Sequence, residues 1–132
     1  MSGTTANLNN TGDNFDTGND SIVIVSNLET IPGGKTLDTT GFTPKVIPAG
    51  HIIIEQTSNG VLKPMPVSGE NYAALLASHT YKGVLISSIL TAKPFAAIMV
   101  RGSVNRNASK YGIASILSAV VTALPLIRFT KD

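Results

Sequence analysis

The sequence Gly34-Lys35-Thr36 matches the last three residues of the phosphate-binding loop motif. In such a loop, backbone N–H groups and the lysine hold phosphates at the start of a helix. The full pattern requires glycine where Glu29 stands, and the residues after Thr36, Leu37-Asp38-Thr39-Thr40-Gly41, are typical of a turn. We therefore interpret the segment as an exposed turn and predict no nucleotide site.

The two histidines and the central acids are the other candidates for chemistry. His51 and His79 do not lie at metal-binding spacing from carboxylates or cysteines. His51 is predicted to begin a strand and His79 to end a short helix, so we expect a surface or helix-end role for both. Glu55 and Glu70 are the only acids in residues 39–131, and no pattern pairs them for acid–base work. Because a Gly-x-Ser-x-Gly elbow is also absent, we predict no enzyme activity, no metal and no cofactor.

Composition indicates one compact domain. The chain has 132 residues, of which 42% are apolar, and it has no cysteine, so the core must hold the fold without disulfides. The first 20 residues lack the basic start and apolar segment of a secretory signal, so we interpret the glycosylation patterns Asn9-Asn10-Thr11 and Asn107-Ala108-Ser109 as chance matches. The longest uncharged stretch, residues 111–127, contains serine and proline, and we interpret it as a buried helix rather than a membrane span.

The net charge of +2 is unevenly distributed. Residues 1–40 contain five acids and one lysine, whereas residues 41–132 contain nine lysines or arginines and three acids. This asymmetry would let the acidic part of one subunit attract the basic body of a neighbour. The bases are scattered singly, without a run of lysine or arginine, and no aromatic residue is interleaved with them as a base-stacking platform would need, so we predict no nucleic-acid binding.

The N-terminal segment is predicted to be an arm. Residues 1–20 are almost entirely small or polar, and we expect them to become ordered only against a partner. Phe15 is the natural anchor of this arm. The β-branched run in residues 21–26 predicts a strand that is apolar on both faces, and therefore buried on both sides, within the domain or across a subunit interface.

Residues 46–132 have the pattern of a β domain. Asn59-Gly60 is a hairpin turn signal between predicted strands at residues 51–56 and 61–67. Pro64 and Pro66 cannot donate to a strand ladder, so the second strand is expected at a sheet edge or to be irregular.

Further elements follow in the same domain. We predict a short helix at residues 70–78, a buried strand at 83–87, a long strand at 95–104 and a final strand at 126–130. A helix beginning after Asn107 or Ser109 is predicted from an apolar stripe formed by Ile113, Ile116, Leu117, Val120, Val121 and Leu124. Its opposite face carries small residues, which suits either close approach of another surface or plain exposure to solvent.

Four motifs occur in a recognisable order. Pro48-Ala49-Gly50 leads into the hairpin, Gly83-Val84-Leu85 forms a strand, Arg101-Gly102-Ser103-Val104 precedes the last helix, and Leu126-Ile127-Arg128-Phe129 closes the chain. In this order and spacing, residues 46–132 resemble the lambda-type head decoration (capsid cement) family of tailed phages.

The resemblance implies a fold and a function. The expected fold is mainly β with one or two short helices (α+β): a flexible arm (residues 1–20), a strand and loop segment (21–45) and a β-tulip-like decoration domain (46–132). The expected function is a structural virion protein that binds the major capsid protein on the capsid exterior as a homotrimer at three-fold positions. It would be made in the bacterial host cytoplasm, without nucleic acid or membrane as partner. The candidate capsid contacts are Asn14, Phe15, Asp16, Ile22, Val23, Ile24 and Val25.

Residues 21–45 lie outside the recognised pattern, and alternatives stay open. The chain could form the base of a phage head fibre or another virion adaptor. It could also be a small bacterial module that binds a carbohydrate or peptide, although it has no tryptophan and only three tyrosines to form an aromatic platform. An enzyme that uses the Lys35 loop or the histidines is the third alternative.

Overall fold

A computed structural model describes residues 20–131 as a mainly β fold with two short helices, in agreement with the predicted fold class. In this part of the chain, neither helix has the length and hydropathy needed to cross a membrane. In chain order the elements are α1 (Asp20–Val23), β1 (Ile24–Thr30), β2 (Lys35–Thr36), β3 (Val46–Ile47), β4 (Ile52–Gln56), β5 (Leu62–Pro64), β6 (Val67–Ser68), β7 (Asn71–Tyr72), β8 (His79–Leu85), β9 (Ile89–Leu90), β10 (Phe95–Ala96), β11 (Ile98–Asn105), α2 (Leu117–Ala123) and β12 (Ile127–Thr130).

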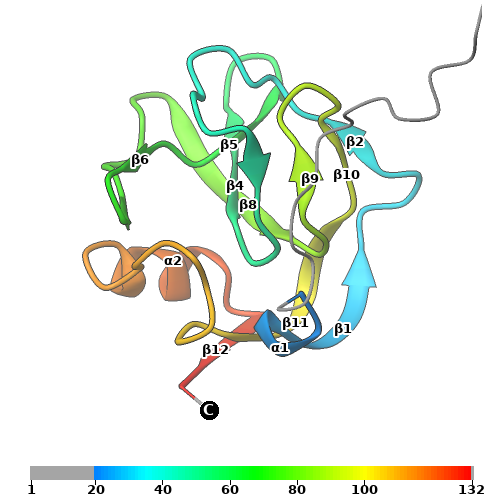
Figure 1. Cartoon of the computed structure of the whole chain (residues 1–132), viewed down its shortest axis with the longest axis vertical. Helices are drawn as coiled ribbons and strands as arrows, with labels where there is room; N and C mark the ends of the chain where they lie inside the picture. The colour runs from blue at the N-terminus through cyan, green and yellow to red at the C-terminus, as the bar shows by residue number, and fades with distance from the viewer. Residues whose placement is uncertain (1–19, 132) are drawn as a thin grey trace, which may run out of the picture.

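One six-stranded sheet organises the molecule (Figure 1). Its strands follow the order β1-β11-β8-β4-β5, and β12 adds to β11 in parallel, whereas the neighbours along the main order are antiparallel. Three two-stranded ribbons, β2–β10, β3–β9 and β6–β7, surround the sheet. β1 and β5 are therefore the outer strands of the main order.

The sheet is covered on both faces. In the interior strand β4, Ile52 and Ile54 face one apolar cluster and Ile53 faces the other, and all three side chains are buried. This explains a strand of consecutive isoleucines, because alternate side chains point to opposite faces. The first cluster lies toward α2 and includes Val84, Met99, Val104, Tyr111, Ile113, Ile116 and Val120; the second lies toward the short ribbons and includes Leu37, Ile47, Leu62, Leu85, Ala96 and Ile98.

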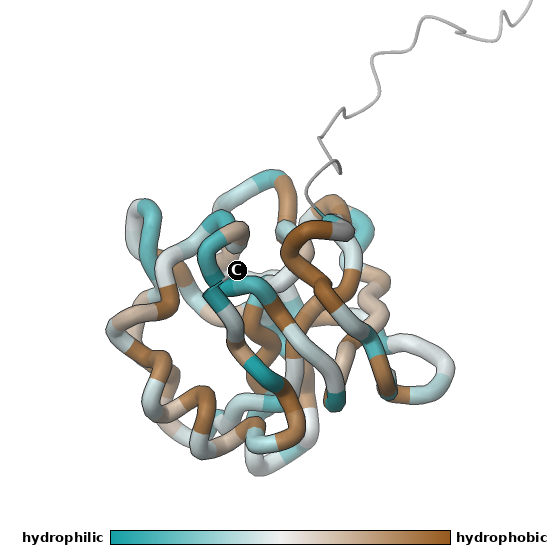
Figure 2. The backbone as a smooth tube through the Cα atoms, turned by 90° about the horizontal axis from the view of Figure 1, so that it is seen from below, coloured by the Kyte–Doolittle hydropathy of each residue, from teal (hydrophilic) through white to brown (hydrophobic). Residues whose placement is uncertain are grey.

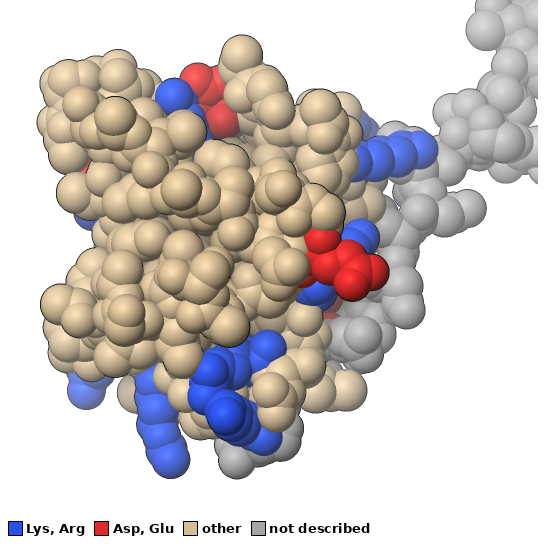
Figure 3. Space-filling model, turned by 90° about the vertical axis from the view of Figure 1, so that its left-hand side faces the viewer, with Lys and Arg blue, Asp and Glu red and all other residues tan. Residues whose placement is uncertain are grey.

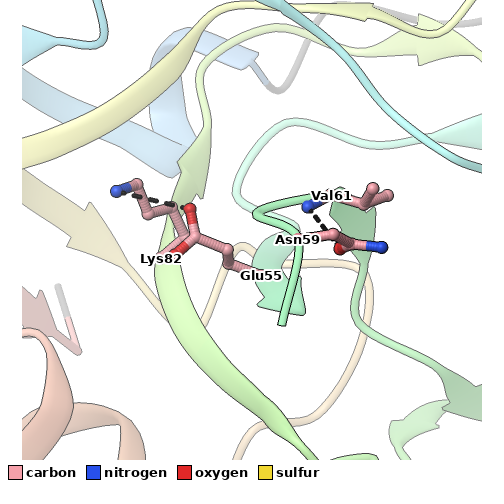
Figure 4. Close-up of polar contacts among 4 residues, drawn as sticks. All are labelled: Glu55, Asn59, Val61 and Lys82. Carbon is pink, nitrogen blue, oxygen red and sulfur yellow. Dashed lines mark hydrogen bonds and ion pairs between the residues drawn. The ribbon is translucent and has the colours of Figure 1, made fainter. Parts of the chain in front are cut away.

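The predicted hairpin is confirmed. β4 and β5 are antiparallel, with Ile54 opposite Lys63. In the turn between them, the Asn59 side-chain oxygen accepts a hydrogen bond from the Val61 N–H at 3.0 Å (Figure 4). β5 lies at the edge of the sheet and ends at Pro64, and Pro66 lies beyond its end, as expected for residues that cannot donate to a strand ladder.

The predicted helix at residues 70–78 is wrong. Asn71 and Tyr72 form β7, and the chain continues irregularly to β8. The cause is a set of hydrogen bonds to a distant segment: Gly112 N–H donates to the Glu70 carbonyl at 2.8 Å, and Tyr72 N–H donates to the Gly112 carbonyl at 3.0 Å. These tertiary contacts override the helix propensity of the alanines and leucines that follow.

The same contacts shorten the last helix. α2 begins at Leu117, not after Asn107 or Ser109, because Gly112 is held in a bridge to Asn71. Four residues of the predicted stripe are nevertheless buried in the first cluster, namely Ile113, Ile116, Val120 and Leu124. The small residues on the other side of α2 are exposed.

Two predicted strands also differ from the structure. The strand expected at residues 95–104 is interrupted at Ala97, which separates β10 from β11. The strand expected at residues 21–26 begins only at Ile24, because residues 20–23 form α1. Val23 there packs so closely on the backbone that a Cβ atom on Gly50 would collide with its Cγ1, so the turn before β4 requires glycine.

Candidate interaction surface

The residues that suggested chemistry are dispersed in the fold. Lys35 and Thr36 form β2 beside β10, so no helix begins after Gly34. The Glu55 carboxylate lies 3.6 Å from the Lys82 ammonium across β4 and β8 (Figure 4). Glu70 contributes its backbone carbonyl to the contact with the 112 segment. Among residues 20–131, no group of three histidines, cysteines or acids is placed to hold a metal ion.

The expected positions of both histidines are wrong. His79 begins β8 instead of ending a helix, and its Nδ1–H donates to the Ala77 carbonyl at 2.7 Å. His51 is fully buried instead of lying on the surface. Three rings surround it edge-on or nearly so, with centroids at 5.3 Å (Phe42), 5.1 Å (Tyr72) and 5.5 Å (Tyr111).

The buried imidazole of His51 is held in its neutral form. Its Nε2 lies 2.9 Å from the Met65 carbonyl, which can only accept, so Nε2 carries the proton. Nδ1 is buried and has no partner within the described residues. Burial lowers the pKa of His51 to about 4, against the smaller opposing effect of the hydrogen bond to Met65. The aromatic cluster is thus a packing centre that excludes charge.

Apolar side chains are exposed where the described chain begins. Ile22 in α1 and Val25 and Leu28 in β1 are 52%, 53% and 64% exposed. We call these three residues the α1–β1 apolar surface. Figure 2 shows the corresponding hydrophobic stretch at the start of the described chain, at the end of the molecule that also carries β12.

Two β-bulges in β1 turn Val25 and Leu28 of this surface outward. Ile24 lies opposite Val104 and Ser26 opposite Ser103, so Val25 is an extra residue in β1. Further along, Asn27 lies opposite Gly102 and Glu29 opposite Arg101, so Leu28 is a second extra residue. A bulge leaves its extra residue unpaired and re-aims the side chain. The two inserted residues of β1 are both apolar, and both point outward.

The candidate contacts named from the sequence are placed unevenly. Ile22 and Val25 are accessible, but Val23 is 3% exposed and lies in the core, and Ile24 is partly buried against it. Val23 is therefore unsuited to contact a partner. The prediction that both faces of this run are buried does not hold within the domain, where Ile22 and Val25 are exposed. Asn14, Phe15 and Asp16 lie outside the described residues.

Leu28 was missed by the sequence analysis, because a single leucine among polar residues carries no periodic signal. With strict alternation it would share a face with Ile24, and only the bulges turn it outward. The spacing between Val25 and Leu28 in the sequence does not indicate a bulge.

Asp20 fixes the start of this surface to the body of the protein. Its carboxylate accepts hydrogen bonds from the Ser88 N–H at 2.8 Å and from the Ser88 hydroxyl at 2.7 Å. The same hydroxyl accepts from the Ala49 N–H at 3.0 Å. α1 is therefore positioned by a charge-assisted contact to a loop far away in sequence.

Comparisons with protein-family models, with curated proteins and with solved structures found no match.

Proposed function

We propose that the protein is a structural, non-enzymatic virion protein, a decoration subunit that binds the outer surface of a phage capsid as a homotrimer and stabilises it. The α1–β1 apolar surface contacts the major capsid protein, together with the arm that precedes it in sequence. In this proposal the domain has the β-tulip-like fold of lambda-type decoration proteins and provides the contacts between subunits.

The observation that carries the proposal is the pair of bulges in β1. Isolated exposed apolar residues are common on protein surfaces, but here three occur within seven residues of an outer strand and its preceding helix. The bulges also make regular pairing with another strand difficult, so β1 is better suited to side-chain contacts than to strand addition. The motif order in residues 46–132 supports a capsid as the partner.

Two measurements test this proposal. Light scattering of the purified protein should give three times the mass of the chain. Co-sedimentation with capsids assembled without the protein should then pellet it. The double variant Val25→Ser/Leu28→Ser should bind capsids at least about tenfold more weakly, since each buried apolar side chain contributes about 1.5–3 kcal/mol.

Phe95 provides the matched control. It is 71% exposed on β10, which is far from the apolar surface in sequence and belongs to a different sheet from β1, so Phe95→Ser should leave capsid binding unchanged. A monomer that does not pellet with capsids would contradict the proposal.

A small ligand-binding module is the second candidate, and Phe95 is the observation that favours it. This exposed ring lines a shallow hollow of about 440 Å³ with Gly33, Gly34 and Lys35. Exposed aromatic rings are common contacts for sugars and peptides. Chemical-shift changes of the Gly33 and Gly34 amides on titration with oligosaccharides would support this candidate, and a flat response would reject it.

A further inference from the structure

Four basic side chains gather at the end of the molecule where α1 lies. They come from the turn after β11 and from the end of β12, and we call Arg106, Lys110, Arg128 and Lys131 the basic end. Figure 3 shows lysine and arginine side chains projecting together at this lower end, whereas most of the face above is uncharged.

Backbone contacts bring the two segments of the basic end together. Arg106 N–H donates to the Thr130 carbonyl at 2.9 Å, and the Asn107 side-chain amide donates to the Lys131 carbonyl at 2.9 Å. β12 runs parallel to β11, with Arg128 beside Ser103. The turn after β11 and the end of β12 therefore lie side by side.

The charge of the basic end is not compensated within the described residues. None of its four side chains forms an ion pair with a carboxylate of residues 20–131, and residues 71–131 contain seven bases and no acid. Asp132 lies outside the described residues. Arg106 has its Nε buried without a hydrogen-bond partner there. Four like charges on two neighbouring segments favour an anionic partner.

The basic end adjoins the α1–β1 apolar surface. Ile24, the first residue of β1, lies opposite Val104, two residues before Arg106, and α1 contacts β11. The elements that carry these residues, α1, the start of β1 and β12, lie at one end of the molecule (Figure 1). Such a mixture of apolar and basic residues is typical of protein interfaces, in which an apolar centre has a charged rim.

We propose that the basic end binds an acidic protein surface, and, resting on the proposed function, that this surface belongs to the outside of the capsid. A protein is favoured over nucleic acid because the two nearby aromatic rings pack on the core: Tyr111 is 5% exposed, and Phe129 is partly buried against the first cluster. Neither ring forms an open base-stacking platform beside the cations. The subunit would then stand with α1 and β12 toward the capsid and with β2 and the β9–β10 turn away from it.

The test is co-sedimentation of the full chain with capsids at several salt concentrations. Arg128→Glu/Lys131→Glu should weaken binding about tenfold or more at 0.1 M salt, and the wild-type affinity should fall steeply between 0.05 and 0.5 M salt, as roughly expected for exposed charges. Lys110→Glu/Lys131→Glu serves as a second variant in case the first fails to fold. Circular dichroism spectra should match the wild type.

Lys35→Glu/Lys93→Glu is the matched control. It changes the net charge by the same amount, but at exposed positions in β2 and in the β9–β10 turn, which Figure 1 places at the other end of the molecule. This variant should bind capsids like the wild type.

The outcomes separate this inference from the proposed function. Wild-type protein that pellets with capsids, with the basic-end variants pelleting equally well, would overturn the inference and leave the proposed function standing. Equal weakening by the control variant would also overturn it, because net charge alone would then act. Wild-type protein that never pellets with capsids, or that binds double-stranded DNA in a manner abolished by the basic-end variants, would overturn the inference as well.

Discussion

Acidification should destabilise this protein through His51. Burial lowers the pKa of the folded His51 to about 4, from an ordinary value of 6.5. Near pH 6 the unfolded chain therefore binds a proton at His51 that the folded chain does not bind. The stability that comes from the neutral His51 is fully present above pH 6.5 and is lost as the pH falls toward 4. Lowering the pH from 7 to 5 should cost about 2 kcal/mol of the free energy of unfolding from this residue alone.

The surroundings of His51 explain why protonation of the folded protein is unfavourable. A second proton would have to reside on Nδ1, which is buried with no acceptor within the described residues. The groups facing the ring are Phe42, Tyr72 and Tyr111, and none of them is an acid. Burial raises the pKa of both tyrosines, so they remain neutral over this range. Between pH 7 and 5 most carboxylates also keep their charge, so this window isolates the histidine.

Urea unfolding at pH 7 and pH 5, followed by circular dichroism, measures the effect. The urea midpoint should decrease by about 1–2 M for a chain of this size. His51→Gln keeps a donor for the Met65 carbonyl but cannot titrate, so its midpoint should be nearly equal at the two pH values. His79→Gln leaves the buried cluster intact and should keep the wild-type difference.

A direct titration of the ring covers the case in which His51→Gln does not fold. In the wild type, the NMR signals of the His51 ring should show no protonation down to about pH 5. A ring that titrates near pH 6.5, or an equal loss of stability in wild type and His51→Gln, would refute the reasoning.

Three further predictions concern the packing around this core. Val120→Ala should cost about 2 kcal/mol of unfolding free energy in chemical denaturation, because Val120 is fully buried in α2, whereas Val121→Ala, at a 46% exposed neighbour, should change it by less than about 0.5 kcal/mol. Gly50→Ala should cost about 2–4 kcal/mol, seen as a lower melting temperature, since the φ of +84° is strained for alanine and its Cβ would collide with Val23. Tyr72→Phe should cost about 1–3 kcal/mol in the same assay, because its hydroxyl accepts a hydrogen bond from a buried backbone N–H of β4 at 3.1 Å. Equal effects of the two valine variants, or neutral effects of the other two, would contradict these assignments.

Local signals in the sequence were sufficient for the hairpin and for much of the core. Asn59-Gly60 marks its turn because both residues tolerate the required backbone angles, and the strand predicted at residues 51–56 is present as β4, although its burial on both faces was not predicted. Three buried residues near the last helix, Ile113, Ile116 and Val120, follow helical spacing although only the last belongs to α2. Apolar spacing therefore predicted burial better than it predicted the helix itself.

Long-range hydrogen bonds determined what the sequence could not reveal. Tyr72 and Gly112 are 40 positions apart, and their backbones form a hydrogen bond. This contact lies where the helix at residues 70–78 and the start of the last helix were predicted. The burial of His51 depends on three aromatic rings from three separate segments. Local sequence patterns do not predict such long-range contacts.

The candidate surface was only partly predictable for a related reason. Ile22 and Val25 were named from their composition, but the bulges that turn Val25 and Leu28 outward depend on the register with β11. The basic end likewise depends on β12 returning beside β11, which places charges from residues 106 and 131 side by side. Counting charges along the chain shows an excess of bases, but it does not predict that these residues lie at one end of the fold.

Electron cryomicroscopy of phage capsids incubated with the protein would test the proposed function most directly. The account predicts trimeric density on the outside of the capsid, with α1, the bulged strand β1 and the end of β12 facing the major capsid protein. Particles without such density, or density in which Ile22, Val25 and Leu28 face solvent, would contradict it.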